Sequence, residues 1–466
     1  MNDFFILMKP ELMIVAILFF LIVLKLGKGI SNNNLLIVIQ VLLALNFASG
    51  FVLNHEGHLF EDMYQTNAIM VLQKNILNGG VLLIAMLFSD WLQKCDHLSE
   101  FFMLMLSSLL GMFFLISSGN LLMFYLSLEL ATIPVAALAN LHLDRKKSSE
   151  AGMKMILSSA FSSGILLFGI SLMYGATGSL SYVSLPGLLD GSPLQIMAFV
   201  FLFTAFAFKM SIVPFHLWTA DVYEGAPIPV TAFLSVISKG AIAFVFVSVL
   251  YTVFQPYSST WYMMIMVLSI LTMLIGNLFA LRQQNIKRFL AFSSIAQVGF
   301  ILVGISSNSI QGSTSVIYFI FIYIFSNLAA FGVAGLISYF SGKENIDDYK
   351  GLYQTNPLLS WILALALFSL AGIPPTAGFF GKLFLLTAGA SNGTYVFIGI
   401  AAVNMIISLY YYLRVIRAVF MDKNETPVAP IPLQFSTKVG LLICSAGIVF
   451  IGFFSSIYDY IRSLIQ

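Results

Sequence analysis

The stretch AFAFKMSIVPFHLW, residues 205–218, sets one lysine and one proline inside an apolar run. Lys209 stands eight residues from the nearest loop, and Pro214 interrupts the pattern five residues later. A soluble domain could bury a few such turns, but similar apolar runs recur along the whole chain. Because no water competes for polar groups inside a bilayer, a charged residue and a helix break there must be satisfied by the protein itself. The stretch therefore predicts a broken membrane helix around a buried ammonium group.

Composition supports a lipid environment for the entire chain. Of its 466 residues 59% are hydrophobic and only 9% are charged, too few to cover a soluble surface of this size. The net charge of +2, without a basic block, gives no sign of nucleic-acid binding. Cys95 and Cys444 are too few for a disulfide framework, an iron–sulfur cluster or a structural zinc site. We therefore expect an all-α, polytopic membrane protein in contact with the lipid bilayer.

Apolar runs separated by polar or Gly/Pro-rich breaks predict about fourteen transmembrane helices, each about the length that a bilayer core requires. The first is interpreted as a retained span and not a signal peptide, because no small-residue cleavage site follows it. The predicted spans are residues 11–27, 33–53, 67–89, 101–117, 119–140, 150–175, 194–217, 228–251, 261–280, 286–306, 315–340, 357–386, 393–417 and 437–461.

The distribution of positive charge predicts how the chain is oriented. Loops that follow odd-numbered spans hold fifteen lysines and arginines, whereas the loops after even-numbered spans hold none. Positive loops favour the cytoplasmic side, so both termini are expected on the non-cytoplasmic side. The fifteen cations are Lys25, Lys28, Lys94, Arg145, Lys146, Lys147, Arg282, Lys287, Arg288, Lys343, Lys350, Arg414, Arg417, Lys423 and Lys438.

Four ionisable residues fall deep inside predicted spans: Glu129, Lys209, Lys239 and Lys382. Each charge at a helix centre costs roughly 2.5–3.5 kcal/mol, so such residues usually face a polar interior and a partner. Burial disfavours the charged form of a lysine, and a nearby carboxylate restores it, so Lys/Glu pairs suit proton transfer. The alternative for each is a structural ion pair. Lys74, closer to a helix end, is interpreted as a snorkelling residue.

Other polar residues have secondary interpretations. Glu150 and Lys154 are spaced i, i+4 at the start of a span, where they either stabilise the helix end or form a proton entry. Asp221 and Glu224 are expected in a loop network or at a partner contact, with a proton-exit role as the alternative. His216 is interpreted as an interfacial or hydrogen-bonded residue, with a link in a polar axis as the alternative, because no second His or Cys stands at metal-ligand spacing.

Pro214 and the pair Pro374–Pro375 predict two broken helices, each close to a buried lysine. A proline inside a helix frees the carbonyl four residues earlier, here that of Met210 or Leu370. Discontinuous helices beside ionisable residues are typical of carriers built from inverted repeats. We expect a single transmembrane domain: N-terminal helices in residues 1–100, five-helix repeats in 101–251 and 261–417, and a C-terminal helix in 437–466.

Several longer motifs are specific enough to indicate a protein family. The strongest are LSLELATIP around Glu129, FKMSIVPFHLWTADVYEGAPIPV from Phe208, IKRFLAFSSIAQVGFILVG from Ile286 and LAGIPPTAGFFGKLFLL from Leu370. With them, the sequence resembles the antiporter-like membrane subunits of the proton-pumping NADH:quinone oxidoreductase, complex I, and among these the subunit N family. The resemblance runs from about the third predicted helix to the last.

The resemblance implies a function and specific residue roles. Glu129 and Lys209 would form the pair of the first half-channel, Lys239 the central link and Lys382 the outlet of the second half-channel. Many relatives have His where this chain has Gln297, which cannot titrate, so water either replaces that link or is oriented by Gln297.

The resemblance also implies a setting in a bacterial inner (plasma) membrane. Expected neighbours are the antiporter-like subunit M and the small subunits K and J. This chain itself would bind no cofactor and no metal, while other subunits would hold NADH, FMN, iron–sulfur clusters and a quinone. Two other functions remain open: a subunit of a multicomponent Na⁺/H⁺ antiporter, and a structural membrane scaffold whose buried charges fix helix packing.

Overall fold

A computed structural model describes residues 2–27, 30–52, 55–391, 393, 395–454 and 456–466. The first half contains a hairpin, β1 (Gly57–Leu59) and β2 (Tyr64–Thr66), and the helices α1 (Asn2–Leu7), α2 (Lys9–Leu26), α3 (Asn32–Ser49), α4 (Ala68–Leu87), α5 (Ser89–Leu92), α6 (Leu98–Ile116), α7 (Leu121–Ala139), α8 (Lys146–Thr177), α9 (Leu185–Leu188), α10 (Pro193–Met210) and α11 (Leu217–Gly225). The chain continues through α12 (Ile228–Ala232), the π-helical turn η1 (Phe233–Ser238), α13 (Lys239–Thr252), η2 (Gln255–Tyr257), α14 (Ser258–Arg282), α15 (Ile286–Ile305), α16 (Ile310–Ser341), η3 (Ile346–Tyr349), α17 (Leu352–Thr355), α18 (Pro357–Ala371), α19 (Ala377–Ala390), α20 (Tyr395–Phe420), α21 (Phe435–Phe453) and α22 (Ser456–Ile465).

The helical membrane fold predicted from the sequence is confirmed. Within the described residues, twelve helices are long and apolar enough to cross a membrane, and α18 and α19 are shorter apolar helices. The helix α2 completes the set of predicted spans, although it carries Lys9, Glu11 and Lys25. Several start where an Asn or Ser side chain accepts a hydrogen bond from the first turn, as Asn120 does from the backbone N–H of Met123 (2.7 Å).

Three predicted spans are each divided between two separate helices in the structure. The span 194–217 ends as a helix at Met210 and resumes in α11, and the span 357–386 is divided between α18 and α19. The span 437–461 is wrong at its end, because α21 stops at Phe453 and a separate helix, α22, follows. Asp459 and Arg462 lie in α22, whose polar and apolar residues fall on opposite faces, so it is not a continuation of the apolar span.

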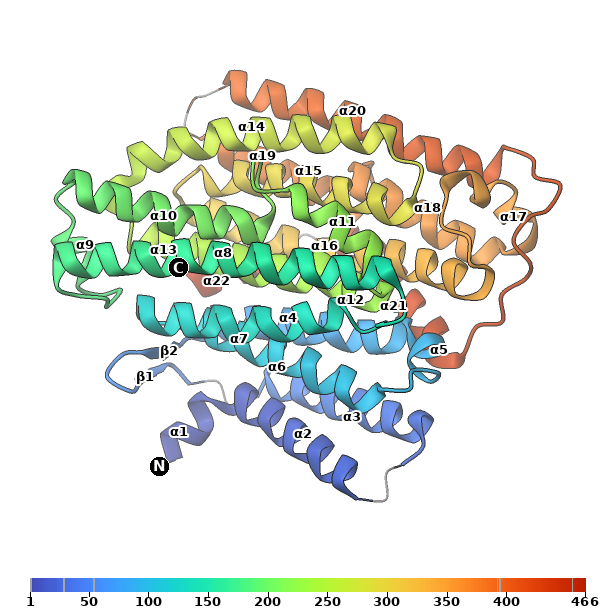
Figure 1. Ribbon diagram of the computed structural model, residues 1–466. Helices are drawn as coiled ribbons and strands as arrows, with labels where there is room; N and C mark the ends of the chain where they lie inside the picture. The colour runs from blue at the N-terminus through green and yellow to red at the C-terminus, as the bar shows by residue number, and fades with distance from the viewer. Residues whose placement is uncertain (1, 28–29, 53–54, 392, 394, 455) are drawn as a thin grey trace.

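The helices lie roughly side by side along one axis (Figure 1). The N-terminus, the β-hairpin and α9 lie at the left end of this view, and the C-terminus lies in its left half. The right end carries α5 and α17, together with the connections that hold the predicted cluster of lysines and arginines. Lys28, one of those cations, lies outside the described residues.

Two groups of five crossings share the same construction. The first runs from α6 to α13 and the second from α14 to α20, and because five is odd the second starts from the opposite side of the membrane. Both contain a 32-residue third helix, α8 or α16. In both, the fourth crossing is broken, between α10 and α11 or between α18 and α19. The arrangement is that of two inverted repeats.

The breaks of the two repeats match in detail. Helix α10 ends at Ser211 with φ +65°, and α18 ends at Gly372 with φ +86°. In each case the backbone N–H of the next residue donates a hydrogen bond to a carbonyl in the last turn of the preceding helix. These bonds run from Ile212 N–H to Ala207 O (2.8 Å) and from Ile373 N–H to Phe368 O (3.0 Å). A left-handed residue followed by a back-donated bond is a common way to close a helix C-terminus. Pro214 lies between α10 and α11, and Pro374 and Pro375 lie between α18 and α19.

The first two helices of each repeat also approach each other closely at one glycine. A Cβ atom on Gly111 of α6 would lie 2.4 Å from the backbone nitrogen of Ala131 in α7. A Cβ atom on Gly276 of α14 would lie 2.6 Å from the backbone nitrogen of Ala296 in α15. Because the facing atoms belong to the backbone, neither pair of helices can absorb a side chain without separating.

We expect Gly111→Ala and Gly276→Ala each to destabilise the protein by about 1–3 kcal/mol, the usual cost of overpacking a close helix contact. The control is Gly164→Ala in α8, where a Cβ atom meets nothing within 4 Å. The measurement is the thermal midpoint and the membrane content of each variant. Equal midpoints for Gly111→Ala and Gly164→Ala would contradict the close approach.

Candidate functional site

Lys239 lies at the centre of the bundle, on the helix that follows the π-helical turn η1. Its side chain is 4% exposed, and Nζ donates to Ser294 Oγ of α15 (2.9 Å). The ammonium also lies 5.4 Å from the centre of the Tyr223 ring. Turns of π-helix inside α-helices are frequent at functional sites because they redirect side chains. Here the lysine after the turn reaches across to the second repeat.

Lys382 lies just beyond the second helix break, fully inside the protein. Its side chain is 1% exposed, and Nζ donates to the backbone carbonyls of Leu370 (2.7 Å) and Ala371 (3.3 Å). These are the last carbonyls of α18, which have no partner further along their own helix. The Leu370 carbonyl is one of the two that the proline positions predict to be free. A cation at the C-terminus of a helix is also favoured by the helix dipole.

Gln297 of α15 connects the surroundings of these two lysines. Its Nε2 donates to Leu370 O (3.0 Å), the carbonyl that Lys382 also contacts, and to Tyr412 Oη (3.1 Å). The Tyr412 hydroxyl in turn lies 2.5 Å from Ser293 Oγ. The side chain of Gln297 is 1% exposed, and its Oε1 has no hydrogen-bond partner among the described residues.

Two small cavities, each of about 10 Å³, lie on either side of Gln297 and Tyr323. One is lined by Lys239 and Ser294, the other by Lys382 and Ser369, and both are lined by Gln297 and Tyr323. Gln297 Oε1 has no hydrogen-bond partner within the described part of the chain, whereas the Tyr323 hydroxyl has the side chains of Ser294 and Asn327 as hydrogen-bonding neighbours. A cavity of this size holds about one water, and buried polar atoms without a protein partner are usually satisfied by one.

Glu129 and Lys209 occupy the first repeat. Lys209 Nζ donates to Thr132 Oγ1 (3.0 Å) on α7, and the Ser163 hydroxyl of α8 donates to the Glu129 carboxylate. Thr132 follows Glu129 by about one helical turn, so both contacts lie on neighbouring turns of α7. Among the described residues no ion pair joins Glu129 directly to Lys209. Both side chains are only half-buried, in contrast to Lys239 and Lys382.

A network of charges joins α8, α11 and α15 at the cation-rich end. Lys154 pairs with Glu150 (2.6 Å), as its spacing predicts, and with Asp221 (2.6 Å). Arg288 then bridges Asp221 (2.8 Å) and Glu224 (2.9 Å). Asp221 and Glu224 therefore do form a network, but they lie on a helix and not in a loop.

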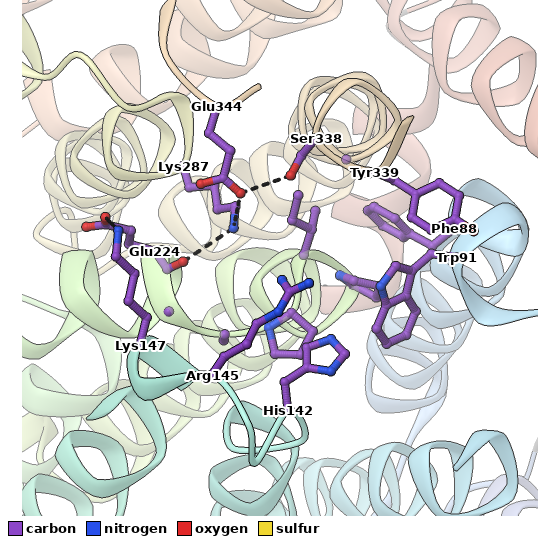
Figure 2. A pocket seen from close by; sticks show the side chains of 16 residues that line it. Phe88, Trp91, His142, Arg145, Lys147, Glu224, Lys287, Ser338, Tyr339 and Glu344 are labelled. Atoms are coloured by element: carbon purple, nitrogen blue, oxygen red, sulfur yellow. Dashed lines mark hydrogen bonds and ion pairs between the residues drawn. The ribbon is translucent and has the colours of Figure 1, made fainter. Parts of the chain in front are cut away.

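A cavity of about 410 Å³ opens beside this network (Figure 2). Lys287 pairs with Glu344 (2.7 Å) and donates to the backbone carbonyl of Glu224 (3.3 Å), while Arg145 and His142 point into the hollow from below. Glu224, which lines the cavity, directly follows Tyr223 along α11, and the ring of Tyr223 lies 5.4 Å from Lys239 Nζ. Helix α11 therefore contacts both the cavity and the central lysine.

Protonation states in this cavity follow from its contacts. Burial raises the pKa of Glu344, but the charge and hydrogen bond of Lys287, with hydrogen bonds from Ser338 and Asn285, outweigh it and hold that pKa below its usual range. Burial and then the charges of Arg145 and Lys287 lower the pKa of His142. At neutral pH the cavity therefore contains a charged carboxylate and an uncharged imidazole.

His216 lies directly before α11, mostly buried, with a backbone hydrogen bond to Pro214. None of the described hydrogen bonds joins it to Lys239, Gln297 or Lys382. No group of three or more His, Cys, Asp or Glu residues that could hold a metal ion occurs among the described residues. Trp218, two residues further on, donates to Phe208 O (3.2 Å) and so covers one carbonyl near the end of α10.

The interpretation of Lys74 as a snorkelling residue is wrong. Its side chain is 1% exposed and forms an ion pair with Glu11 (2.5 Å), which is itself fully buried. Glu11 stands in the first turn of α2, so sequence position alone suggested a helix end near water. The tertiary structure alone brings Glu11 of α2 within reach of Lys74 of α4. The sequence did contain a signal for this pair. An acidic residue stands in the first apolar run, and a lysine without an assigned partner stands in a later one.

Comparison with known proteins gives a consistent result. A family model described as "NADH:quinone oxidoreductase/Mrp antiporter, TM" matches residues 118–408. NADH-quinone oxidoreductase subunit N of Phocaeicola vulgatus is 47% identical over 87% of this chain and 86% of its own length. Subunit N of Azobacteroides pseudotrichonymphae is 42% identical over 99% of this chain and 98% of its own.

Solved structures resemble the chain over almost its whole length. A chain of respiratory complex I from Thermus thermophilus with bound aureothin gives a TM-score of 0.80 at 28% identity, covering 95% of this chain and 96% of that one. A chain of the Mrp complex from Dietzia sp. DQ12-45-1b gives a TM-score of 0.88 at 20% identity. The match covers 98% of this chain and 96% of that one. At 20% identity the second match shows the fold alone.

We expect one water in each cavity beside Gln297, within hydrogen-bond distance of Gln297 Oε1, because this buried acceptor is otherwise unsatisfied. The measurement is a density map of the protein in its membrane at a resolution that shows ordered water. Gln297→Leu, which removes the polar atoms, should lose these waters. Empty cavities in the unsubstituted protein would contradict the expectation.

Proposed function

The chain belongs to the NADH-quinone oxidoreductase subunit N family, and from that premise we propose how its buried charges move protons. It is a proton-translocating membrane-arm subunit of that oxidoreductase, a translocase complex. The Na⁺/H⁺ antiporter alternative is not favoured, because the relatives that match at 42–47% identity are named subunit N.

The proposed route crosses both repeats. Protons enter from the cation-rich end, at Glu150, Lys154 and the cavity between Glu224 and Lys287. They reach Lys239 through the first-repeat pair of Glu129 and Lys209, or past Tyr223. From Lys239 they cross the waters beside Gln297 to Lys382. The observation that carries this proposal is the pair of cavities that share Gln297 and Tyr323 between the two lysines.

Gln297 cannot accept a proton and pass it on, so its role in this route is to orient water. Its amide nitrogen donates to Leu370 O and Tyr412 Oη, which leaves Oε1 available to accept a hydrogen bond from a water. A fixed acceptor orders a water chain without itself titrating. The arrangement supports a water, oriented by Gln297, as the link that a histidine provides at this position in many relatives.

Control of the route lies with Glu129 and Lys209. In this structure Lys209 is held by Thr132 and Glu129 by Ser163, and the direct pair is open. At about 5 Å and an effective dielectric of about 20, closing such a pair is worth about 3 kcal/mol. Moving one proton against about 150 mV costs about 3.5 kcal/mol. Opening and closing this pair is therefore of the size needed to drive one transfer step.

The energy comes, in this proposal, from quinone reduction in neighbouring subunits, with subunits M, K and J adjacent to this one. The solved complexes that resemble the chain support membrane-arm partners in general. The proposal assigns no redox centre to this chain, in keeping with its two cysteines, of which Cys444 is buried. NADH, FMN, iron–sulfur clusters and quinone would belong to other subunits.

The protein is a multi-span membrane protein, and the proposal places it in the bacterial inner membrane with both termini on the non-cytoplasmic side. The positive-inside distribution supports this orientation, and both termini lie in the half of the view opposite the cation-rich end (Figure 1).

Lys382→Ala and Glu129→Ala should each lower the proton-pumping rate of the assembled complex about tenfold, because losing a charge-assisted hydrogen bond costs about 1.5–3 kcal/mol and 1.4 kcal/mol is a factor of ten. The measurement is proton uptake in vesicles, normalised to the content of the complex. Matched controls are Lys423→Ala and Glu425→Ala, both exposed. Intact pumping by Lys382→Ala would refute its role and favour the scaffold reading.

Orientation can be measured with single cysteines in a background without Cys95 and Cys444. Lys423→Cys lies in the cation-rich connection after α20, and Gly187→Cys lies in exposed α9 at the opposite end. A membrane-impermeant maleimide added to the cytoplasmic face should label only Lys423→Cys, and added to the other face only Gly187→Cys. The reverse pattern would overturn the proposed topology.

A further inference from the structure

The large cavity at the cation-rich end has charged side chains on one side and aromatic rings on the other. We call it the cationic cavity, and its volume is about 410 Å³. Lys147 and Lys287 lie on the left in Figure 2, Trp91 and Tyr339 lie on the right, and Arg145 reaches in between them from below. Pockets that bind small molecules usually measure about 300–1,000 Å³. The cationic cavity is therefore large enough for a ligand, and the proposed proton route assigns it none.

The two acidic residues that line the cationic cavity are already neutralised by cations. Glu224 pairs with Lys147 (2.8 Å) through one carboxylate oxygen and with Arg288 (2.9 Å) through the other. Glu344 pairs with Lys287 (2.7 Å). Among the described residues, the lining therefore offers no carboxylate that is free to neutralise a further cation.

Arg145 is the cation that remains without a partner. Its guanidinium points into the hollow (Figure 2), and no ion pair joins it to any described residue, including its chain neighbour Asp144. Lys94 stands at the aromatic side, with Nζ 5.7 Å from the centre of the Tyr339 ring, and it too forms no ion pair within the described part of the chain. Two cations without a carboxylate therefore lie around one cavity.

The electric field in the cationic cavity favours an anion. Burial, followed by the charges of Arg145 and Lys287, lowers the pKa of His142, so an additional positive charge is disfavoured there. The same field attracts a negative group. A guanidinium presents five N–H donors in a planar fork that fits a phosphate, and in the described structure the side chain of Arg145 donates to no protein acceptor.

The position of the cationic cavity indicates the source of the anion. It lies at the end of the helices where lysines and arginines collect, and basic pockets between membrane helices on the cytoplasmic side bind phospholipid headgroups. Phe88 and Trp91 provide an apolar wall, and Leu143 and Phe340, each next in the chain to a lining residue, are exposed. Apolar surface suits the glycerol and acyl carbons of a phospholipid, whereas a free phosphate ion gains nothing from it.

We propose that the cationic cavity binds the phosphate group of an anionic phospholipid of the cytoplasmic leaflet. The guanidinium of Arg145 donates to the phosphate oxygens, and Lys94 supplies a second positive charge close to the headgroup. Trp91 and Tyr339 pack against the glycerol and the first acyl carbons. The inference goes beyond the proposed proton route and does not depend on it, since only the choice of leaflet follows from the proposed orientation.

The first test is photo-crosslinking of lipid to the purified complex. Phosphatidylglycerol with a diazirine on its first acyl carbons is added to lipid-depleted complex, and the labelled peptides are identified by mass spectrometry. We expect saturable labelling around Trp91 and Tyr339, at least about fivefold stronger than with the matching phosphatidylcholine, because each nearby Lys or Arg favours an anionic lipid by about that factor. Equal labelling by the two lipids would overturn recognition of an anionic headgroup.

The variant Arg145→Gln with Lys94→Gln removes both unpaired cations, and it should lower the apparent affinity for phosphatidylglycerol about tenfold, because charge-assisted hydrogen bonds are lost. The matched control is Arg282→Gln with Lys423→Gln. It also removes one arginine and one lysine, both exposed at the same end and outside the lining, and should keep the affinity. Equal affinity in the two double variants contradicts the assignment to Arg145 and Lys94.

Competition with inorganic phosphate distinguishes a lipid phosphate from a free one. Labelling by phosphatidylglycerol should persist in millimolar phosphate, because the free ion makes no contact with the aromatic side of the cavity. Loss of the labelling under these conditions would assign the cationic cavity to a free anion and overturn the lipid.

A density map of the unsubstituted complex in phosphatidylglycerol nanodiscs gives a test that needs no variant. We expect a headgroup within hydrogen-bond distance of the Arg145 guanidinium. An empty cavity, or one filled by an acidic side chain of a neighbouring subunit, would overturn the proposal. None of these measurements depends on proton pumping, so failure here leaves the proposed route standing, and loss of the route leaves the lipid site standing.

Discussion

The whole structure depends on satisfying polar groups where no bulk water is available. The contact of Lys382 with the carbonyls of Leu370 and Ala371 shows how this is done. Breaking α18 leaves carbonyls that cannot find a partner along the helix, and a buried ammonium needs acceptors. The carbonyls at the end of α18 accept hydrogen bonds from the Lys382 ammonium, so both buried groups are satisfied. The same break also positions Gln297, so a local requirement of the backbone organises the centre of the second repeat.

The two repeats solve the same packing problem with different chemistry. The close glycine contacts at Gly111 and Gly276 and the left-handed residues Ser211 and Gly372 are shared. The lysines are not at equivalent places, because Lys209 precedes its break and Lys382 follows its own. The first repeat thus leaves its ammonium half-buried beside a carboxylate, whereas the second encloses it against backbone carbonyls. One repeat is suited to switching an ion pair and the other to holding a proton carrier in an enclosed site.

Charge is also distributed by depth. At the cation-rich end Lys154, Arg288 and their carboxylates form a partly exposed network in which each charge has several partners. At mid-depth Lys239 and Lys382 contact only neutral groups among the described hydrogen bonds. A charge held by neutral groups is more easily neutralised than one held by opposite charges. This gradient separates residues that collect protons from residues that pass them on.

The sequence by itself determined the lipid environment, the number of crossings and the positions of the two breaks, and it identified Lys239 and Lys382 as deeply buried charges. It did so because hydrophobic length, proline and a charge in an apolar run each have one dominant physical consequence in a bilayer. Only the tertiary structure decided which polar groups meet. The pairing of Glu11 with Lys74, the separation of Glu129 from Lys209 and the cavities around Gln297 all depend on how distant helices pack. Spacing along one helix predicts neighbours such as Glu150 and Lys154, but it contains no information on the angle and depth at which another helix arrives.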